Sequence, residues 1–216
     1  SPTFGIAFGG GGARGLAHVH VVEAFDELGI KPVAIAGSSI GAIIGAAMAA
    51  GMTGREIRDY ARSILSRRSE VASRMWQARP DSFADLMKGG LHVSQFNVER
   101  ILQAYLHEHL PGSFAQLQIP LKVTATDYYG HKLAVLEEGD LISALAASAA
   151  IPAVFRPVTR GGRVLIDGGI YNPVPFDLVG HEADVVVAID VVGAPVENGL
   201  RRPNSLDLMF GATQLM

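Results

Sequence analysis

Ser39 lies between two glycines in the pattern Gly37-Ser38-Ser39-Ile40-Gly41, at the junction of an apolar strand and an alanine-rich helix. A Gly-x-Ser-x-Gly at such a junction is typical of a nucleophile elbow. There the serine takes a strained backbone conformation, and the positions two before and two after it have no room for a Cβ. The positive end of the following helix would stabilise a developing oxyanion. Because the chain has 25 glycines in 216 residues, this short pattern needs support from its surroundings.

A second glycine-rich stretch, residues 9–15, follows the first predicted strand. A glycine loop between a strand and a helix directs several backbone N–H groups at one point, which favours an anion. A phosphate loop of the Walker type is excluded, because no Gly-Lys-Ser/Thr closes it. The dinucleotide pattern Gly10-x-Gly12-x-x-Gly15 matches, but no acid ends a second strand about 20 residues further on. The third interpretation is an oxyanion hole, which needs a nucleophile such as Ser39 on the neighbouring strand.

A serine hydroxyl becomes a nucleophile when a base takes its proton, and Asp167 is a candidate for that base. It ends a predicted buried strand, on the side of the sheet where parallel α/β folds place their sites, and Gly168 and Gly169 follow it. The structural alternative is an Asp that forms a turn or caps a helix.

A Ser39, Asp167, His181 triad in α/β-hydrolase order is a rival arrangement. Two features count against it: Ser39 follows only the second strand, and His181 lies in the link to a later strand. His18 and His20, in the helix after the glycine loop, are expected to be packing or surface residues.

Hydrophobic periodicity predicts strands that alternate with helices along most of the chain. The expected strands cover residues 4–8, 33–36, 120–128, 132–136, 163–166 and 183–190, and the expected helices cover 16–28, 40–50, 54 onward, 97–110 and 141–150. This alternation predicts the α/β class, a three-layer α/β/α fold with a central, mainly parallel sheet and helices on both faces. We expect a single domain over residues 1–216.

The composition of the chain narrows the classes of function and the cellular locations that it could have. Hydrophobic residues make up 49% and charged residues 18%, which is typical of an apolar globular domain, and a net charge of −3 argues against a nucleic-acid partner. The chain has no cysteine, which excludes disulfides and thiolate sites and suits a reducing compartment. No apolar stretch reaches the roughly 20 residues of a transmembrane segment. We therefore expect a cytoplasmic protein, with a location peripheral to the membrane as an alternative.

An arginine-rich segment at about residues 54–96 is predicted to form a helical cap or insertion. Seven arginines fall between Arg55 and Arg79, and its first part has the apolar spacing of an amphipathic helix. Two interpretations stay open: a solvated basic face over a core segment, or a mobile cap that contacts an anionic membrane surface.

Three motifs together resemble the patatin-like phospholipase family in order and spacing. They are Gly10-Gly11-Gly12-Ala13-Arg14-Gly15, Gly37-Ser38-Ser39-Ile40-Gly41 and Asp167-Gly168-Gly169. Further matches are Gly15-Leu16-Ala17-His18, Ala147-Ser148-Ala149-Ala150-Ile151-Pro152 and the run from Asp167 to Pro175. The resemblance covers nearly the whole chain apart from the arginine-rich segment and is greatest to bacterial cytoplasmic members. His20 departs from it, since similar sequences usually carry a small residue there.

The resemblance implies a patatin-like fold and a serine lipid acyl hydrolase of the phospholipase, lysophospholipase or esterase type. Ser39 would attack the acyl carbonyl to form an acyl-enzyme, and Asp167 would accept its proton and later activate water, without a histidine. The N–H groups of Gly10, Gly11 and Gly12 would form the oxyanion hole. The supporting residues would be Arg14, which braces the loop, and Gly15, Gly37, Gly41, Gly168 and Gly169.

No metal or cofactor is needed for this chemistry, and the expected partner is a lipid or ester substrate. The alternative is a catalytically silent lipid-binding or regulatory module, which would have the same fold and could keep the motifs.

Overall fold

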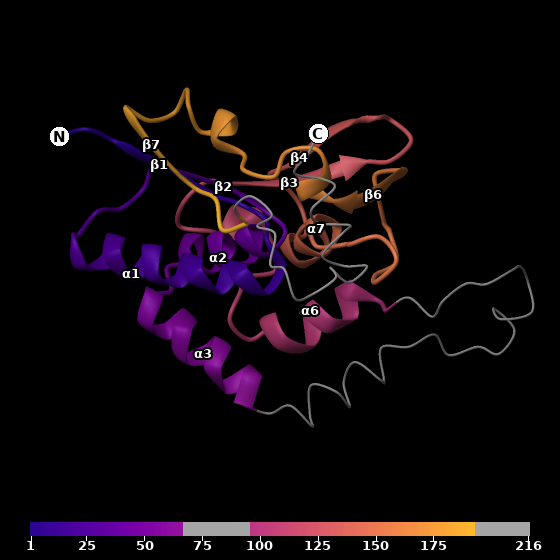
Figure 1. Cartoon of the computed structure of the whole chain (residues 1–216), viewed down its shortest axis with the longest axis horizontal. Coiled ribbons are helices and arrows are strands. Elements are labelled where there is room, and N and C mark those ends of the chain that lie inside the picture. The colour runs from indigo at the N-terminus through magenta and orange to yellow at the C-terminus, as the bar shows by residue number, and fades with distance from the viewer. Residues whose placement is uncertain (67–95, 193–216) are drawn as a thin grey trace, which may run out of the picture.

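The computed structural model describes residues 1–66 and 96–192 and contains a seven-stranded sheet (Figure 1). The strands are β1 (Phe4–Phe8), β2 (Ala34–Ser38), β3 (Leu121–Asp127), β4 (Lys132–Leu136), β5 (Val158–Arg160), β6 (Arg163–Asp167) and β7 (Val185–Ile189). The α-helices are α1 (His18–Glu27), α2 (Ile40–Ala49), α3 (Gly54–Ser66), α6 (Val98–Leu106) and α7 (Leu141–Ser148). The short 3₁₀ helices are η1 (Gly12–Ala17), η2 (Phe114–Gln116), η3 (Gly168–Ile170) and η4 (Phe176–Leu178).

The strands are hydrogen-bonded to one another in the order β5-β6-β3-β2-β1-β7, with β6 and β2 along one edge of β3 and β4 along the other. The strands β7, β1, β2 and β3 run parallel, whereas β4 and β6 are antiparallel to β3. The predicted α/β class with a mainly parallel central sheet is confirmed.

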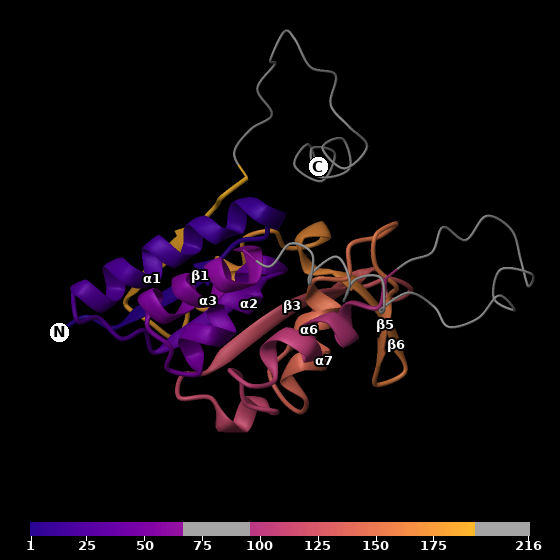
Figure 2. The ribbon, with the colours of Figure 1, turned by 90° about the horizontal axis from the view of Figure 1, so that it is seen from below.

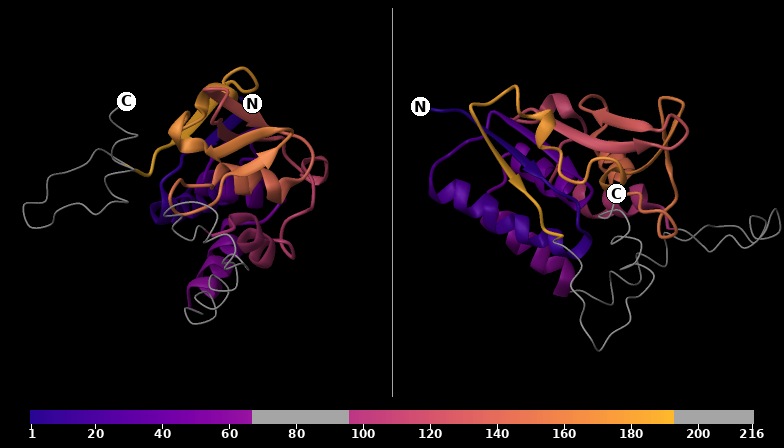
Figure 3. Two further views of the ribbon diagram at one scale, coloured as in Figure 1. Left: turned by 90° about the vertical axis from the view of Figure 1, so that its right-hand side faces the viewer. Right: turned by 45° about the horizontal axis from the view of Figure 1, so that its top comes forward.

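The five α-helices lie on one side of this sheet, as Figure 2 and the two views of Figure 3 show. The helices α2 and α7 pack directly on the strands, and α1, α3 and α6 pack on other helices. Ile6, Phe8 and Ile35 point into this main core, while Ala7 and Ala36 point to the opposite face, where they meet Val179. The predicted three-layer fold would have a second layer of helices on that opposite face. Among the described residues, the segment around η4 packs there.

Local sequence signals set the starts of two helices. Asp140 caps α7 by accepting a hydrogen bond from the Ser143 N–H at 2.6 Å, and Asn97 caps α6 by accepting one from the Arg100 N–H at 3.0 Å. The hairpin predicted between β3 and β4 is confirmed. The helix predicted from residue 16 begins at His18, because residues 12–17 form the 3₁₀ helix η1, and the helix predicted to residue 110 ends at Leu106. The strand β5 was not predicted, since three residues are too few for a periodic pattern.

The first part of the arginine-rich segment is the helix α3, which packs against α1. The Gly54 N–H donates to Asp26 Oδ2 at 2.7 Å, and the Arg58 guanidinium forms an ion pair with Glu23. Residues 67–95, which hold the remaining arginines of the segment, lie outside the described residues, so the cap stays a prediction. None of the helices in the described ranges combines the length and the apolar character needed to cross a bilayer.

Candidate active site

The site forms where β2 and β6 meet end to end along one edge of β3. The strand β4 pairs with residues 123–127 of β3. Since β2 pairs with residues 121–124 and β6 with residues 125–127, both overlap this span and must occupy the other edge of β3. Ser38 at the end of β2 is opposite Thr124, and Asp167 at the end of β6 is opposite the next residue, Ala125. The two strands therefore run toward each other and place the residues that end them side by side. As predicted, Asp167 ends a strand at the edge of the sheet where Ser39 lies, but β6 reaches this edge antiparallel to β3.

Ser39 occupies a sharp turn between β2 and α2, with φ 53° and ψ −124°. This is a sparsely populated backbone conformation for a residue other than glycine, and it costs on the order of 1–3 kcal/mol. A Cβ at Gly37 would lie 2.5 Å from the Ala42 Cα, and one at Gly41 would lie 2.3 Å from the Phe8 carbonyl oxygen. Both positions therefore require glycine, and α2 can begin directly against β1.

A buried hydroxyl on α7 holds this turn in place. The Ser39 N–H donates a hydrogen bond to Ser148 Oγ at 2.8 Å, and Ser148 is fully buried. This bond satisfies a backbone donor at the strained residue, which would otherwise be unpaired at a cost of about 1–3 kcal/mol. In the sequence, Ser148 stands out only as part of the run Ala147-Ser148-Ala149-Ala150-Ile151-Pro152. Its contact with Ser39 joins residues 109 positions apart, so no local pattern reveals it.

Ser39 and Asp167 form a direct pair. Ser39 Oγ donates a hydrogen bond to Asp167 Oδ2 at 2.7 Å, and both residues are 5% exposed. The second carboxylate oxygen, Oδ1, accepts the Gly169 N–H at 2.8 Å, which orients the group. A Cβ at Gly168 would lie 2.2 Å from the Thr124 carbonyl oxygen, so glycine is required where the chain leaves Asp167.

Burial raises the pKa of the Asp167 carboxyl to about 6, although the hydrogen bonds from Ser39 and Gly169 act in the opposite direction. A carboxylate with this pKa is a stronger base than an exposed one and is still mostly ionised at neutral pH. The arrangement can therefore take a proton from the Ser39 hydroxyl.

The histidine of the rival triad takes no part in this pair. His181 is exposed in the turn that follows η4, and no hydrogen bond among the described residues joins it to Ser39 or Asp167. Within residues 1–66 and 96–192, no group of three or more histidine, aspartate or glutamate side chains is arranged to hold a metal ion.

The glycine-rich loop lies beside Ser39, since a Cβ at Gly10 would be 3.6 Å from the Ser39 Cβ. The Gly10 N–H donates to the Pro173 carbonyl oxygen at 2.9 Å, so this amide is already engaged. Here the structure departs from the expectation that Gly10 donates to an oxyanion. Gly11 and Gly12 have φ values of 158° and 55°, and within the described ranges their N–H groups have no hydrogen-bond partner. These two amides remain available to an anion.

His18 and Arg14 hold the two ends of the loop. The His18 ring is fully buried against Phe8 with a centroid distance of 5.1 Å, and its Nε2 lies 2.8 Å from the Gly9 carbonyl oxygen. Nε2 must carry the proton, because a carbonyl oxygen only accepts. Burial lowers the pKa of His18, so the ring is neutral. At the other end, Arg14 Nη1 donates to the Val192 carbonyl oxygen at 3.0 Å. This hydrogen bond ties the loop to the chain that follows β7, which is consistent with the bracing role expected of Arg14.

The fold and the site define an α/β protein in which a glycine-rich loop and a strained serine turn meet at the end of a mainly parallel sheet. The patatin-like phospholipase family model matches residues 6–179, and the chain belongs to this family.

Two curated proteins are examples of relatives of this chain. An uncharacterized NTE family protein of Mycobacterium bovis is 35% identical over 196 residues, covering 90% of this chain and 50% of that protein. Patatin-like phospholipase domain-containing protein 6 of Mus musculus is 30% identical over 198 residues, covering 88% of this chain and 13% of that protein. The chain thus spans half or less of the length of these curated relatives.

Two solved structures are also similar to the chain. VipD from Legionella pneumophila has a TM-score of 0.47 at 18% identity, covering 79% of this chain and 46% of that chain. Full-length ExoU of Pseudomonas aeruginosa, in complex with SpcU, has a TM-score of 0.45 at 17% identity, covering 69% of this chain and 38% of that chain.

Proposed function

We propose that this protein is a serine lipid acyl hydrolase that cleaves carboxylic ester bonds with a Ser39–Asp167 dyad. The observation that carries the proposal is the 2.7 Å hydrogen bond from Ser39 Oγ to Asp167 Oδ2, formed at a strained strand-to-helix turn beside the glycine-rich loop. Membership of the patatin-like phospholipase family supports a lipid substrate.

In the first half of the reaction, Ser39 Oγ attacks the carbonyl carbon of the ester while its proton passes to Asp167 Oδ2. The resulting oxyanion accepts hydrogen bonds from the Gly11 and Gly12 N–H groups and lies near the positive end of α2. Collapse of the tetrahedral intermediate breaks the bond to the alcohol, which leaves with the proton held by Asp167.

In the second half, water attacks the acyl-Ser39 ester and gives a proton to Asp167. Collapse of the second tetrahedral intermediate releases the carboxylic acid and returns that proton to Ser39 Oγ. The turn presents the hydroxyl while the buried carboxylate serves as the base in both halves, so no histidine is needed.

A fluorophosphonate probe tests the assignment. We expect the probe to label the wild type with a mass increase that maps to Ser39, and to leave Ser39→Ala unlabelled. The wild type should hydrolyse members of a panel of p-nitrophenyl esters and phospholipids, and Ser39→Ala should not. A folded wild type that binds lipid vesicles but neither reacts with the probe nor hydrolyses any ester would instead be a silent lipid-binding module.

Activity is expected to fall below about pH 6, because only ionised Asp167 accepts the Ser39 proton and burial raises its pKa to about 6. Below that pKa, kcat/KM should decrease about tenfold for each pH unit. The measurement is kcat/KM for a p-nitrophenyl ester from pH 4.5 to 8.5, with intrinsic fluorescence recorded at each pH to verify folding. A profile that stays flat down to pH 4.5 would contradict the role of Asp167 as base.

Replacement of His18 by Leu is expected to lower kcat by about tenfold to a hundredfold, because the Gly9 carbonyl loses its donor and the loop beside Ser39 shifts. Misplacement of about 1 Å at a reacting centre has effects of this size. His20→Leu is the matched control: it makes the same change two residues later in α1, where the side chain is 75% exposed. Equal kinetics for the two variants would show that His18 does not position the loop.

We also infer a peripheral contact with anionic membranes through α3. Since Arg58 is paired with Glu23, the contact would rest on the exposed Arg55 and Arg62. The double variant Arg55→Gln/Arg62→Gln should bind anionic vesicles more weakly than the wild type in a sedimentation assay. Unchanged binding would exclude these two residues.

A further inference from the structure

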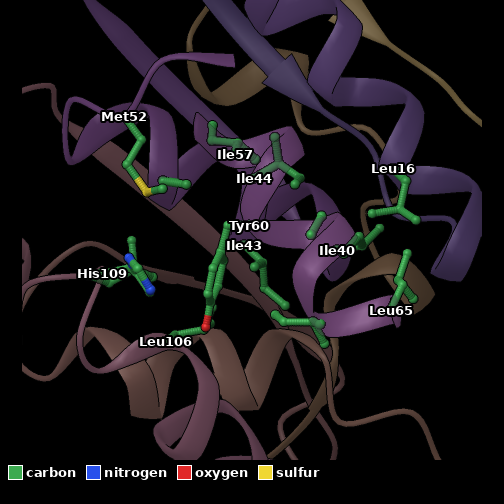
Figure 4. Close-up of a pocket in the computed structure, with 14 residues that line it drawn as sticks. Leu16, Ile40, Ile43, Ile44, Met52, Ile57, Tyr60, Leu65, Leu106 and His109 are labelled. Carbon is green, nitrogen blue, oxygen red and sulfur yellow. The ribbon is translucent and has the colours of Figure 1, made fainter. Parts of the chain in front are cut away.

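An apolar cavity of about 180 Å³ lies between α2, which begins directly after Ser39, α3 and the chain around residues 106–110 (Figure 4). Fourteen residues line it, and nearly all of the lining surface comes from apolar atoms. Among the described residues that line it, only Tyr60 and His109 carry a side-chain hydrogen-bonding group. An apolar cavity of this kind favours a hydrocarbon ligand over water or a charged group.

One end of the cavity begins at the catalytic turn. Ile40 directly follows Ser39 in the chain, and its Cγ2 packs so close to Gly15 that a Cβ there would lie 2.1 Å away. Leu16, which follows the glycine-rich loop, lines the same end. This end of the cavity is therefore lined by the residue that follows Ser39 and by the residue that follows the glycine-rich loop.

The cavity then follows α2 away from Ser39. Ile40, Ile43, Ile44 and Ala47 all line it, and this spacing places them along one stripe of the helix. From Ile40 to Ala47 the helix rises about 10 Å, at about 1.5 Å per residue. Met52 and His109 lie at the opposite side of the view from Leu16 and Ile40, with Tyr60 between them (Figure 4). The His109 ring contacts the Tyr60 ring at a centroid distance of 4.0 Å.

We propose that this cavity binds the acyl chain of the ester substrate, with the carbonyl at Ser39 and the methyl end toward Met52 and His109. This assignment rests on the proposed function. With a C–C bond of about 1.5 Å, an extended chain advances about 1.3 Å per methylene, so the stripe along α2 accommodates about eight carbons. The described residues of the cavity wall include no lysine, arginine, aspartate or glutamate to bind a polar head group, so the head group would lie on the other side of the ester bond.

The expected signature is a chain-length limit. For p-nitrophenyl esters kept below their critical micelle concentrations, kcat/KM should rise about fourfold per methylene from butanoate to octanoate, since each methylene leaves water. The total gain should be on the order of 10²-fold. It should level off between octanoate and dodecanoate, because additional carbons extend past the walls. Equal kcat/KM for butanoate and octanoate would overturn the proposal.

Variants in the cavity test its position. Ala61 lines the cavity from α3, and Ala61→Phe should lower the octanoate-to-butanoate ratio of kcat/KM at least tenfold. Asp59→Phe is the matched control, because it adds the same ring two residues earlier in α3 at a side chain that is 62% exposed, and it should leave the ratio unchanged. Ala47→Leu, which narrows the cavity from α2, should lower the ratio in the same direction and serves if Ala61→Phe does not fold.

The two proposals fail in distinguishable ways. A folded wild type that hydrolyses no ester, butanoate included, contradicts the hydrolase assignment itself. A wild type that hydrolyses butanoate, but whose octanoate-to-butanoate ratio is the same in Ala61→Phe, Ala47→Leu and Asp59→Phe, retains the hydrolase assignment and overturns the acyl site.

Discussion

Asp167→Asn is expected to lower kcat for ester hydrolysis by about 10⁴-fold, because an amide of nearly the same shape cannot accept the Ser39 proton. The side-chain oxygen of Asn can still accept a hydrogen bond, so the turn and the loop should keep their positions. The measurement is kcat and KM for p-nitrophenyl butanoate at pH 8, with KM expected to change little.

His181→Ala is the control for the base. Since His181 is exposed and makes no hydrogen bond to the pair within the described residues, this variant should retain full activity. If His181→Ala abolished hydrolysis while Asp167→Asn retained it, a histidine triad would replace the proposed dyad.

The same Asp167→Asn variant has a stability readout that is independent of catalysis. Burial raises the folded-state pKa of Asp167 from 3.8 to about 6, so the ionised carboxylate destabilises the folded state above that pH. The penalty is on the order of 3 kcal/mol at most, from about 1.4 kcal/mol per pKa unit. Asn removes the charge, so the variant should unfold at a higher urea concentration than the wild type at pH 8. The difference should shrink as the pH falls from 6 toward 4, where the wild-type carboxyl is protonated.

Gly41→Ala is expected to lower the free energy of unfolding by about 3 kcal/mol and to slow probe labelling of Ser39 by more than 10²-fold. A Cβ at Gly41 would lie 2.3 Å from the Phe8 carbonyl oxygen and 2.5 Å from the Gly9 carbonyl oxygen. These are backbone atoms of β1 and the glycine-rich loop, and neither can turn away like a side chain. The start of α2 must therefore move, and Ser39 moves with it.

Gly45→Ala, one turn further along α2, is the matched control. A Cβ there would lie 3.1 Å from Ile35 Cγ2 and 3.4 Å from Phe8 Cδ2, both side-chain atoms that can shift by a few tenths of an ångström. Alanine also has a higher helix propensity than glycine by about 1 kcal/mol, which offsets this strain. Urea unfolding and the labelling rate should be close to wild type. If Gly41→Ala behaved in the same way, close packing of α2 on β1 would not be what positions Ser39.

Much of this fold follows from local patterns. The spacing of apolar residues predicted β1, α2, α3, α7 and the β3–β4 hairpin within a few residues, because amphipathic periodicity and capping residues act over short stretches. The glycines at 37, 41 and 168 were noted from motifs, and each of them is where a Cβ would meet backbone. The short strand β5 and the 3₁₀ helix η1 were missed, since neither is long enough for a periodic signal.

Ser39 and Asp167 meet in the structure by a strand arrangement that the sequence did not predict. The sequence led to Asp167 as the end of a buried strand, but β6 runs antiparallel to β3 and reaches Ser39 from the opposite direction. Strand direction depends on how the chain connects across the sheet, and no residue type in β6 encodes it. The hydrogen bond from the Gly10 N–H to the Pro173 carbonyl oxygen also joins segments far apart in the chain, so the sequence did not predict it either.

By itself, the sequence determined the residue types that the site requires: a serine between glycines, an aspartate followed by glycines, and a loop rich in glycine. These are properties of a few adjacent residues, so composition and spacing carry them. The tertiary structure alone decided which groups lie together: Ser148 on the Ser39 amide, His18 on the Gly9 carbonyl, and the apolar stripe of α2 along the cavity. Each of these depends on the packing of elements distant in sequence, where distance and direction are set by the whole core.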